Sequence, residues 1–167
     1  KKKIGSHNKS ISIFSLYANK IITTAEGGLI STNNNQLAKK IRTLISIGID
    51  KTPWKRNSQK FTYKYDLKYP GYKFNFTDLQ ASIGIEQLKK LDKIISKRKK
   101  IRKKYNLYLD PLVKSKYISL FKETSNTRSA EYIYTILIRN QNFSRDKLIE
   151  HLNKKKISTS VHYIPAF

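Results

Sequence analysis

Short β-branched stretches alternate with longer amphipathic stretches along this chain. Residues 11–14, 21–24 and 28–32 are brief runs rich in Ile, Ser and Thr, which predicts three short strands. Across residues 36–47 the apolar positions fall close to helical spacing, and Gly48 follows as a helix terminator. Strand, turn and helix in succession predict an α/β layer.

The middle of the chain is predicted to be a loop followed by a long helix. Residues 50–70 hold turn formers, aromatics and charges without a stable period, which predicts a long loop. Thr77 and Gln80 have the spacing of a capping box, so a helix is expected to begin there. The helical pattern continues to residue 109, and we expect Pro111 to break it.

The remaining chain predicts a second, smaller α+β domain. Residues 116–120 and 132–138 are expected to form strands, and Ser144 is expected to cap a helix that ends near residue 154. A final strand is predicted over residues 157–163.

Composition narrows the class of protein. The chain has 167 residues, no Met and no Cys, so we expect a piece of a longer protein without disulfides. Its histidines, His7, His151 and His162, are too scattered to predict a metal site. No stretch resembles a signal peptide or a membrane span, and we expect a cytoplasmic protein that does not contact a membrane.

The positive charge of the chain makes nucleic-acid binding an alternative function. Its formal net charge is +24, and its sequence pI is near 10.2. Lysines gathered on one face would favour a nonenzymatic module that binds nucleic acid or an acidic partner. The lysines are instead spread from end to end, which favours a solvated surface and argues against a nucleic-acid partner.

One lysine stands apart from the charge runs. Lys20 lies among small and apolar residues in the stretch FSLYANKIITTAEGG, residues 14–28. A desolvated lysine amine can attack a carbonyl and form a Schiff base, which is the chemistry of pyridoxal phosphate enzymes. Ser15 could offer a hydroxyl to the cofactor phosphate from the same side. The alternative is an ordinary strand-end lysine that reaches out to water.

Three separated segments together resemble one family. They are FSLYANKIITTAEGG, GYKFNFTDLQASIGIEQLKKLD (residues 71–92) and SVHYIPAF (residues 160–167). They resemble the DegT/StrS sugar aminotransferases, which are pyridoxal phosphate enzymes of the aspartate-aminotransferase fold. The resemblance implies an α/β fold: residues 1–92 would be the C-terminal half of the large cofactor-binding domain of a fold type I enzyme. Residues 93–167 would be an incomplete α+β small domain.

The resemblance also implies roles for individual residues. Lys20 matches the lysine that holds the cofactor covalently and then moves the substrate proton. Ser15 matches a serine that binds the cofactor phosphate. Asn75 matches an asparagine that reaches the cofactor phosphate of a partner subunit, which implies a homodimer with a shared active site. Many relatives read GYNYR where this chain reads GYKFN, so Lys73 is the alternative to Asn75 for this contact.

The implied reaction moves an amino group from L-glutamate to a nucleotide-linked keto sugar. His162, in the HYIP segment, matches a histidine at the rim of the active site, and we place it with Lys73 on the substrate side. A sugar dehydratase of the same family is the alternative, but those enzymes generally replace the lysine that Lys20 matches. The chain alone is expected to be inactive, because the resemblance places the aspartate that pairs with the cofactor's pyridine nitrogen before residue 1.

Overall fold

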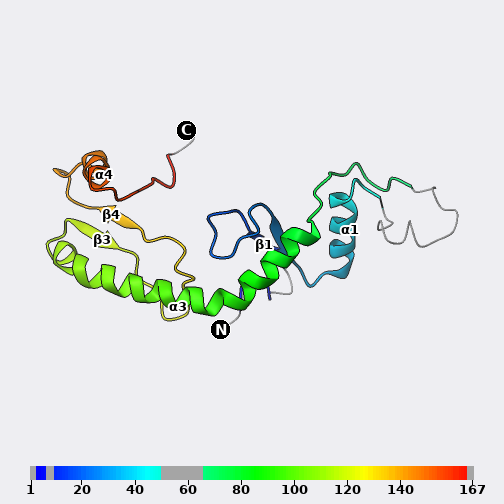
Figure 1. The fold of residues 1–167 in the computed structure, drawn as a ribbon, viewed down its shortest axis with the longest axis horizontal. Helices are drawn as coiled ribbons and strands as arrows, with labels where there is room; N and C mark the ends of the chain where they lie inside the picture. Colours follow the sequence, from blue (N-terminus) through cyan, green and yellow to red (C-terminus); the bar gives the residue numbers. More distant parts are fainter. Residues whose placement is uncertain (1–2, 7–9, 50–65, 165–167) are drawn as a thin grey trace. The chain divides into compact units, whose positions relative to one another are not determined.

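The computed structural model describes residues 3–6, 10–49 and 66–164, which form two compact units (Figure 1). The first unit is Lys1–Ile94 and the second is Ile95–Phe167. The helix α3, Asp78–Lys114, begins in the first unit and ends in the second. The assignment of residues 1–92 and 93–167 to the two domains of a cofactor enzyme stays a prediction.

A two-stranded antiparallel sheet opens the first unit. Strand β1, Ser12–Ser15, pairs with β2, Gly28–Ser31, in a register that places Ser15 opposite Gly28. The strand expected at residues 21–24 is wrong, because this segment turns. The Thr23 hydroxyl donates to Leu16 O at 3.1 Å and accepts from the Ala25 N–H at 2.9 Å, so side-chain hydrogen bonds replace a strand ladder.

Helix α1, Asn35–Ile45, follows β2, as the apolar spacing predicted. The Asn34 side chain caps it by accepting from the Leu37 N–H at 3.0 Å. After the helix, Gly48 adopts a left-handed φ of 79° and its N–H donates to Thr43 O at 2.9 Å. The left-handed turn that ends the helix thus includes Ile47, with a φ of 55°, as well as the predicted Gly48.

The segment that leads into α3 packs against the end of α1 backbone to backbone. A Cβ on Gly48 would lie 1.8 Å from Tyr69 O, and a Cβ on Gly71 would lie 2.2 Å from Gly48 N. Isolated bridges join Ser46 to Lys73 and Ile49 to Leu67. Only glycine permits this approach. Most of the expected loop, residues 50–65, lies outside the described residues.

Helix α3 begins with the predicted capping box and does not break where expected. The Gln80 N–H donates to Thr77 Oγ1 at 3.2 Å, and Gln80 Oε1 accepts from the Thr77 N–H at 3.0 Å. The expected break at Pro111 is wrong, because the helix continues to Lys114. Pro111 lies in the last turn, where its missing N–H removes one hydrogen bond, and Ser115 N–H still donates to Pro111 O at 3.0 Å.

The second unit pairs two short strands and adds one helix. Strand β3, Ile118–Leu120, is antiparallel to β4, Ile136–Ile138, and α4, Arg145–Lys154, follows. The predicted Ser144 cap is confirmed by its bond from the Lys147 N–H at 3.3 Å. Both strands are shorter than predicted, and the strand expected at 157–163 is wrong. Its residues have no ladder partner in the part of the chain that the structure describes.

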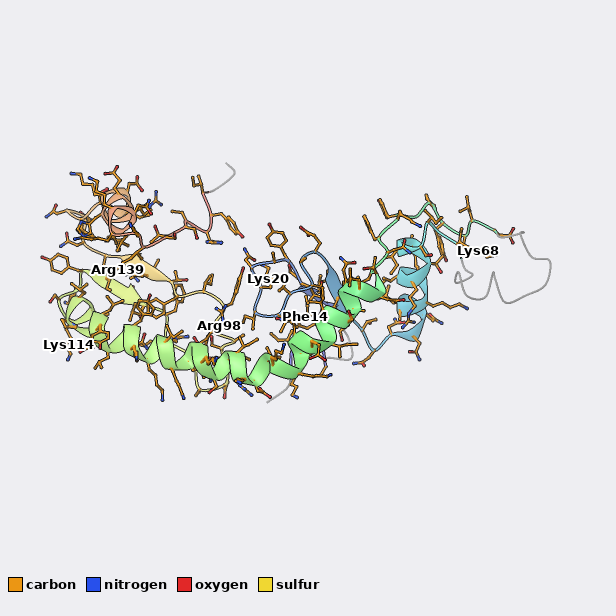
Figure 2. The ribbon with its side chains drawn as sticks, viewed as in Figure 1. Phe14, Lys20, Lys68, Arg98, Lys114 and Arg139 are labelled. Atoms are coloured by element: carbon orange, nitrogen blue, oxygen red, sulfur yellow. The ribbon has the colours of Figure 1, made fainter. Side chains whose placement is uncertain are left out.

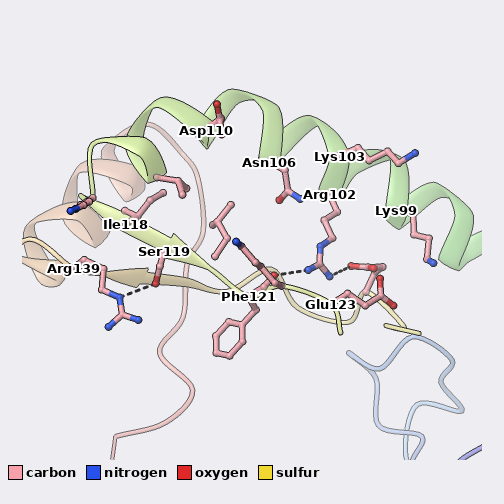
Figure 3. Close-up of a pocket in the computed structure, with 15 residues that line it drawn as sticks. Lys99, Arg102, Lys103, Asn106, Asp110, Ile118, Ser119, Phe121, Glu123 and Arg139 are labelled. Carbon is pink, nitrogen blue, oxygen red and sulfur yellow. Dashed lines mark hydrogen bonds and ion pairs between the residues drawn. The ribbon is translucent and has the colours of Figure 1, made fainter. Parts of the chain in front are cut away.

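Arginine side chains of α3 hold the segment that precedes β4. Arg98 donates to Glu131 O at 3.1 Å and to Tyr132 O at 3.0 Å. Arg102 bridges the Glu131 carboxylate at 2.7 Å and Phe121 O at 2.8 Å (Figure 3). These bonds tie residues 131–132 to α3, and the strand predicted at 132–138 forms only over its last three positions.

Few apolar side chains are fully buried in the described residues. Leu16, Ile49, Ile95 and Ile118 are the only hydrophobic ones less than one-tenth exposed there. Polar contacts such as the Tyr134 hydroxyl bond to Asn106 Oδ1, at 2.8 Å, therefore matter for the packing. Burial raises the pKa of Tyr134, so its hydroxyl is protonated and donates at neutral pH. No helix in the described ranges is long and apolar enough to cross a membrane.

Gly48→Ala is expected to lower the free energy of unfolding of the full-length protein by about 1–3 kcal/mol, since it combines a left-handed φ with a backbone clash. Chemical denaturation measures the change. Gly28→Ala is the control, because an added Cβ there meets only an ordinary contact with Phe14 O. Equal losses for both variants would contradict the close approach at Gly48.

Glu131→Gln is expected to cost about 1–3 kcal/mol of unfolding free energy, because the Glu131 carboxylate is 6% exposed and pairs with Arg102. The exposed Glu86–Lys89 pair is the control. Glu86→Gln should leave the unfolding midpoint in urea nearly unchanged. If the two substitutions shift that midpoint alike, the Arg102 pair does not stabilise the second unit.

Candidate active site

The predicted lysine lies on a loop that its own backbone closes. The Leu16 N–H donates to Gly27 O and the Thr24 N–H donates to Leu16 O, both at 2.9 Å. These bonds join the two ends of the loop between β1 and β2. Lys20 lies on a turn within the loop, where its N–H donates to Tyr17 O at 2.9 Å and its side chain is half-buried (Figure 2).

Ser15 shares this loop with Lys20. It is the last residue of β1, its side chain is exposed, and its Oγ accepts from the Tyr17 N–H at 3.4 Å. That contact uses an acceptor position, so the Ser15 O–H remains a donor for another group. Ser15 therefore lies at the base of the closed loop that carries Lys20, so two of the three predicted cofactor-binding residues share one segment.

The far end of the loop packs tightly against the start of α3. Thr24 is 1% exposed, and its hydroxyl donates to Glu26 O at 2.7 Å. A Cβ on Gly27 would lie 2.6 Å from the Phe76 ring, and a Cβ on Gly84 would lie 3.1 Å from the Thr24 methyl. The two glycines thus provide the room in which Phe76 and Thr24 pack.

Gln80 adds a hydrogen bond between the helix and the loop. Its Nε2 donates to Glu26 O at 2.9 Å, while its Oε1 accepts from the Thr77 N–H. The Glu26 carbonyl therefore accepts from both Thr24 and Gln80. Sequence reasoning identified Gln80 as a capping residue and missed this second contact. The available signal was the amide itself, because a capping glutamine retains its NH₂ group as a donor.

Lys73 and Asn75 lie on the segment just before α3, in the same unit as the loop. The Tyr72 N–H donates to Leu44 O at 2.7 Å and the Phe74 N–H donates to Ile45 O at 2.9 Å, which holds this segment against the end of α1. The Tyr72 and Phe74 rings stack with centroids 5.0 Å apart. Lys73 and Asn75 alternate with these rings, and both are exposed.

His162 lies in the second unit. It is exposed, and its Nδ1 lies 3.1 Å from Ser160 Oγ. The structure thus brings Ser15, Lys20, Lys73 and Asn75 into one unit and describes His162 within the other. The roles of all five residues stay predictions.

The donor set of the loop fits pyridoxal phosphate. The loop carries an amine that can bind an aldehyde covalently and a hydroxyl that can donate to a phosphate oxygen, on a backbone fixed by its own hydrogen bonds. No group of three or more potential metal ligands occurs among residues 3–6, 10–49 and 66–164. The amine and the hydroxyl of this loop suit an organic cofactor that a lysine can hold.

Known proteins match this chain over its whole length. The sequence profile of the DegT/DnrJ/EryC1/StrS aminotransferase family matches residues 1–167. An uncharacterised protein of Methanocaldococcus jannaschii is 42% identical over 98% of the chain and 42% of its own length. The spore coat polysaccharide biosynthesis protein SpsC of Bacillus subtilis is 36% identical over 91% of the chain and 39% of its own length.

Solved structures agree in fold. The PMP form of a protein described as a sugar aminotransferase, from Streptococcus pneumoniae, has a TM-score of 0.79 and 28% identity over 93% of the chain and 40% of its own. The aminotransferase PseC of Helicobacter pylori has a TM-score of 0.78 and is 30% identical, over 93% of this chain and 39% of its own length. The fold is therefore that of the aspartate-aminotransferase type, and the chain spans about two fifths of the length of these relatives.

The cofactor follows from the same comparisons. The Streptococcus pneumoniae protein is known in both PLP and PMP forms, and aminotransferases of this family depend on pyridoxal phosphate. The matched profile, the shared fold and the lysine loop all lead to one assignment. This chain belongs to the DegT/DnrJ/EryC1/StrS aminotransferase family.

Proposed function

We propose that the full-length protein is a pyridoxal phosphate-dependent aminotransferase that moves an amino group from L-glutamate to a nucleotide-linked keto sugar. The observation that carries this proposal is Lys20 on a closed, half-buried loop in a chain of this family. A Campylobacter jejuni relative, 35% identical over 99% of the chain and 41% of its own length, is a UDP-4-amino-4,6-dideoxy-N-acetyl-beta-L-altrosamine transaminase. Its name supports a sugar nucleotide as the acceptor class.

Lys20 has two tasks in this proposal. Its Nζ would hold the cofactor covalently and, as a free amine, would move the substrate proton. When bound, pyridoxal phosphate supplies an electron sink for the carbanion formed as the substrate Cα–H bond breaks. The backbone bonds that close the loop fix the main chain that carries Lys20, which would lower the entropy cost of placing its amine at the reacting atoms.

The other predicted residues bind and orient the cofactor and the substrate. The Ser15 O–H donates to a phosphate oxygen, and Asn75, or Lys73 beside it, reaches the cofactor phosphate of a partner subunit in a homodimer. Their exposure on a segment held firmly against α1 supports this reach across an interface. His162 and Lys73 contact the substrate. The cytoplasmic location expected from the sequence stays a prediction.

Lys20→Arg in the full-length protein is expected to abolish covalent attachment of the cofactor and to lower kcat by at least about 10³-fold, because the variant loses the amine that transfers the proton. Borohydride reduction followed by peptide mass spectrometry locates the attachment site. Formation of 2-oxoglutarate from L-glutamate, with a UDP-keto sugar as acceptor, measures kcat. Lys39→Arg, on the exposed face of α1, is the control and should leave both readouts unchanged. A pyridoxyl group found on another lysine of the wild-type protein would refute the assignment.

Ser15→Ala is expected to weaken binding of pyridoxal phosphate by about tenfold or more, because a hydrogen bond to a charged phosphate contributes about 1.5–3 kcal/mol. Equilibrium dialysis of pyridoxamine phosphate, the amine form of the cofactor, measures this affinity without the covalent bond. Ser12→Ala, at the other end of β1, is the matched control. Equal affinities of the Ser15 and Ser12 variants would remove Ser15 from the phosphate site.

A further inference from the structure

Gln80 makes a directional link between the lysine loop and the start of α3. Its Nε2 donates to Glu26 O at 2.9 Å, across 54 positions of the chain. The close contacts at Gly27 and Gly84 are packing contacts instead. Packing tolerates sliding of one surface over another, whereas a hydrogen bond requires one distance and one direction. The Gln80 bond is therefore the contact that defines where the loop lies relative to α3.

The capping box sets which way the Gln80 amide points. Gln80 is half-buried, and its Oε1 lies 3.0 Å from both the nitrogen and the hydroxyl oxygen of Thr77. The Thr77 N–H can only donate, so it requires the amide oxygen beside it. The NH₂ group consequently faces Glu26 O, which can only accept. Rotation of the amide by half a turn would place donor against donor and acceptor against acceptor.

The loop stays closed without this link. Glu26 O also accepts from the Thr24 hydroxyl at 2.7 Å, and the Thr24 N–H donates to Leu16 O at 2.9 Å. Both bonds lie within the loop and involve no atom of α3. Loss of the Gln80 donor is therefore expected to preserve the shape of the loop and to release its position relative to the helix.

The link joins the two segments of the first unit that carry predicted cofactor residues. Lys20 lies on the loop, and Asn75 lies on the segment that leads into α3. Backbone bonds from Tyr72 and Phe74 hold that segment against α1. Because each segment is held by its own bonds, the bond between them sets their relative position.

We propose that Gln80 is a positioning residue, which places the Lys20 amine for its covalent bond to the cofactor. It acts through the main chain of the loop at Glu26 and does not touch the cofactor. The proposal rests on the proposed function, in which Lys20 holds pyridoxal phosphate. A loop released from α3 would lower the effective concentration of the amine at the cofactor aldehyde.

Stopped-flow absorbance tests the proposal on the full-length protein, freed of cofactor and mixed with saturating pyridoxal phosphate. It measures the rate of attachment, in which the Lys20 amine condenses with the aldehyde and water leaves. Gln80→Glu keeps an acceptor for the Thr77 N–H and loses the donor to Glu26 O, whereas Gln80→Met loses both. Both variants are expected to attach the cofactor about fivefold more slowly or less, since neither holds the loop. The affinity for pyridoxamine phosphate, which forms no covalent bond, should be unchanged.

Thr77→Ala is the matched control, because it removes the capping hydroxyl and keeps both the backbone N–H and the Gln80 donor. It should lower the unfolding midpoint in urea and leave the attachment rate unchanged. An equal loss of rate in Thr77→Ala would show that stability controls attachment, and it would overturn the proposal.

Borohydride reduction of the wild-type protein separates this proposal from the proposed function. Unchanged attachment rates in both Gln80 variants, with the wild-type label on Lys20, would overturn the positioning role alone. A wild-type protein without a label on Lys20 would overturn the proposed function and the positioning role together.

Discussion

The close approach of the lysine loop to the first turns of α3 is the constraint on which the first unit depends. Thr24 is almost fully buried against Gly84, and Phe76 lies where a side chain at Gly27 would be. This contact fixes the far end of the loop, while backbone bonds at Leu16 fix its base. The loop is therefore held by packing at its far end and by hydrogen bonds at its base, so the main chain that carries Lys20 has a defined position.

The second unit is held together to a larger extent by polar contacts. Arg98 and Arg102 each bind two groups on the segments that cross α3, and three of these four acceptors are backbone carbonyls. A planar guanidinium suits this task, because its donors form a rigid fork that bridges neighbouring acceptors. Lys99 and Lys103 lie beside these arginines on α3 and line a groove together with β3 (Figure 3), so one stretch of basic sequence both holds the unit together and adds positive charge to that groove.

Local sequence signals predicted the helices and their caps well, and they predicted the strands less well. The Thr77 and Ser144 caps depend on residues within three positions, which a sequence pattern records directly. The segment at 21–24 failed because threonine side chains there bond the backbone, which β-propensity does not describe. Lys20 and Ser15 could be found as a local motif. The bond from Gln80 to Glu26 spans 54 positions, and no local pattern predicts it.

The oxygen and the nitrogen of the Gln80 amide both make hydrogen bonds, which limits the residues that this position can accept. A capping box accepts glutamate as readily as glutamine, because only an oxygen acceptor is needed. Here the nitrogen of the same amide donates to the Glu26 carbonyl. A carboxylate would bring two lone-pair-bearing oxygens together and lose the donor. Substitution at position 80 is thus constrained by the loop, 54 positions earlier, as well as by the start of α3.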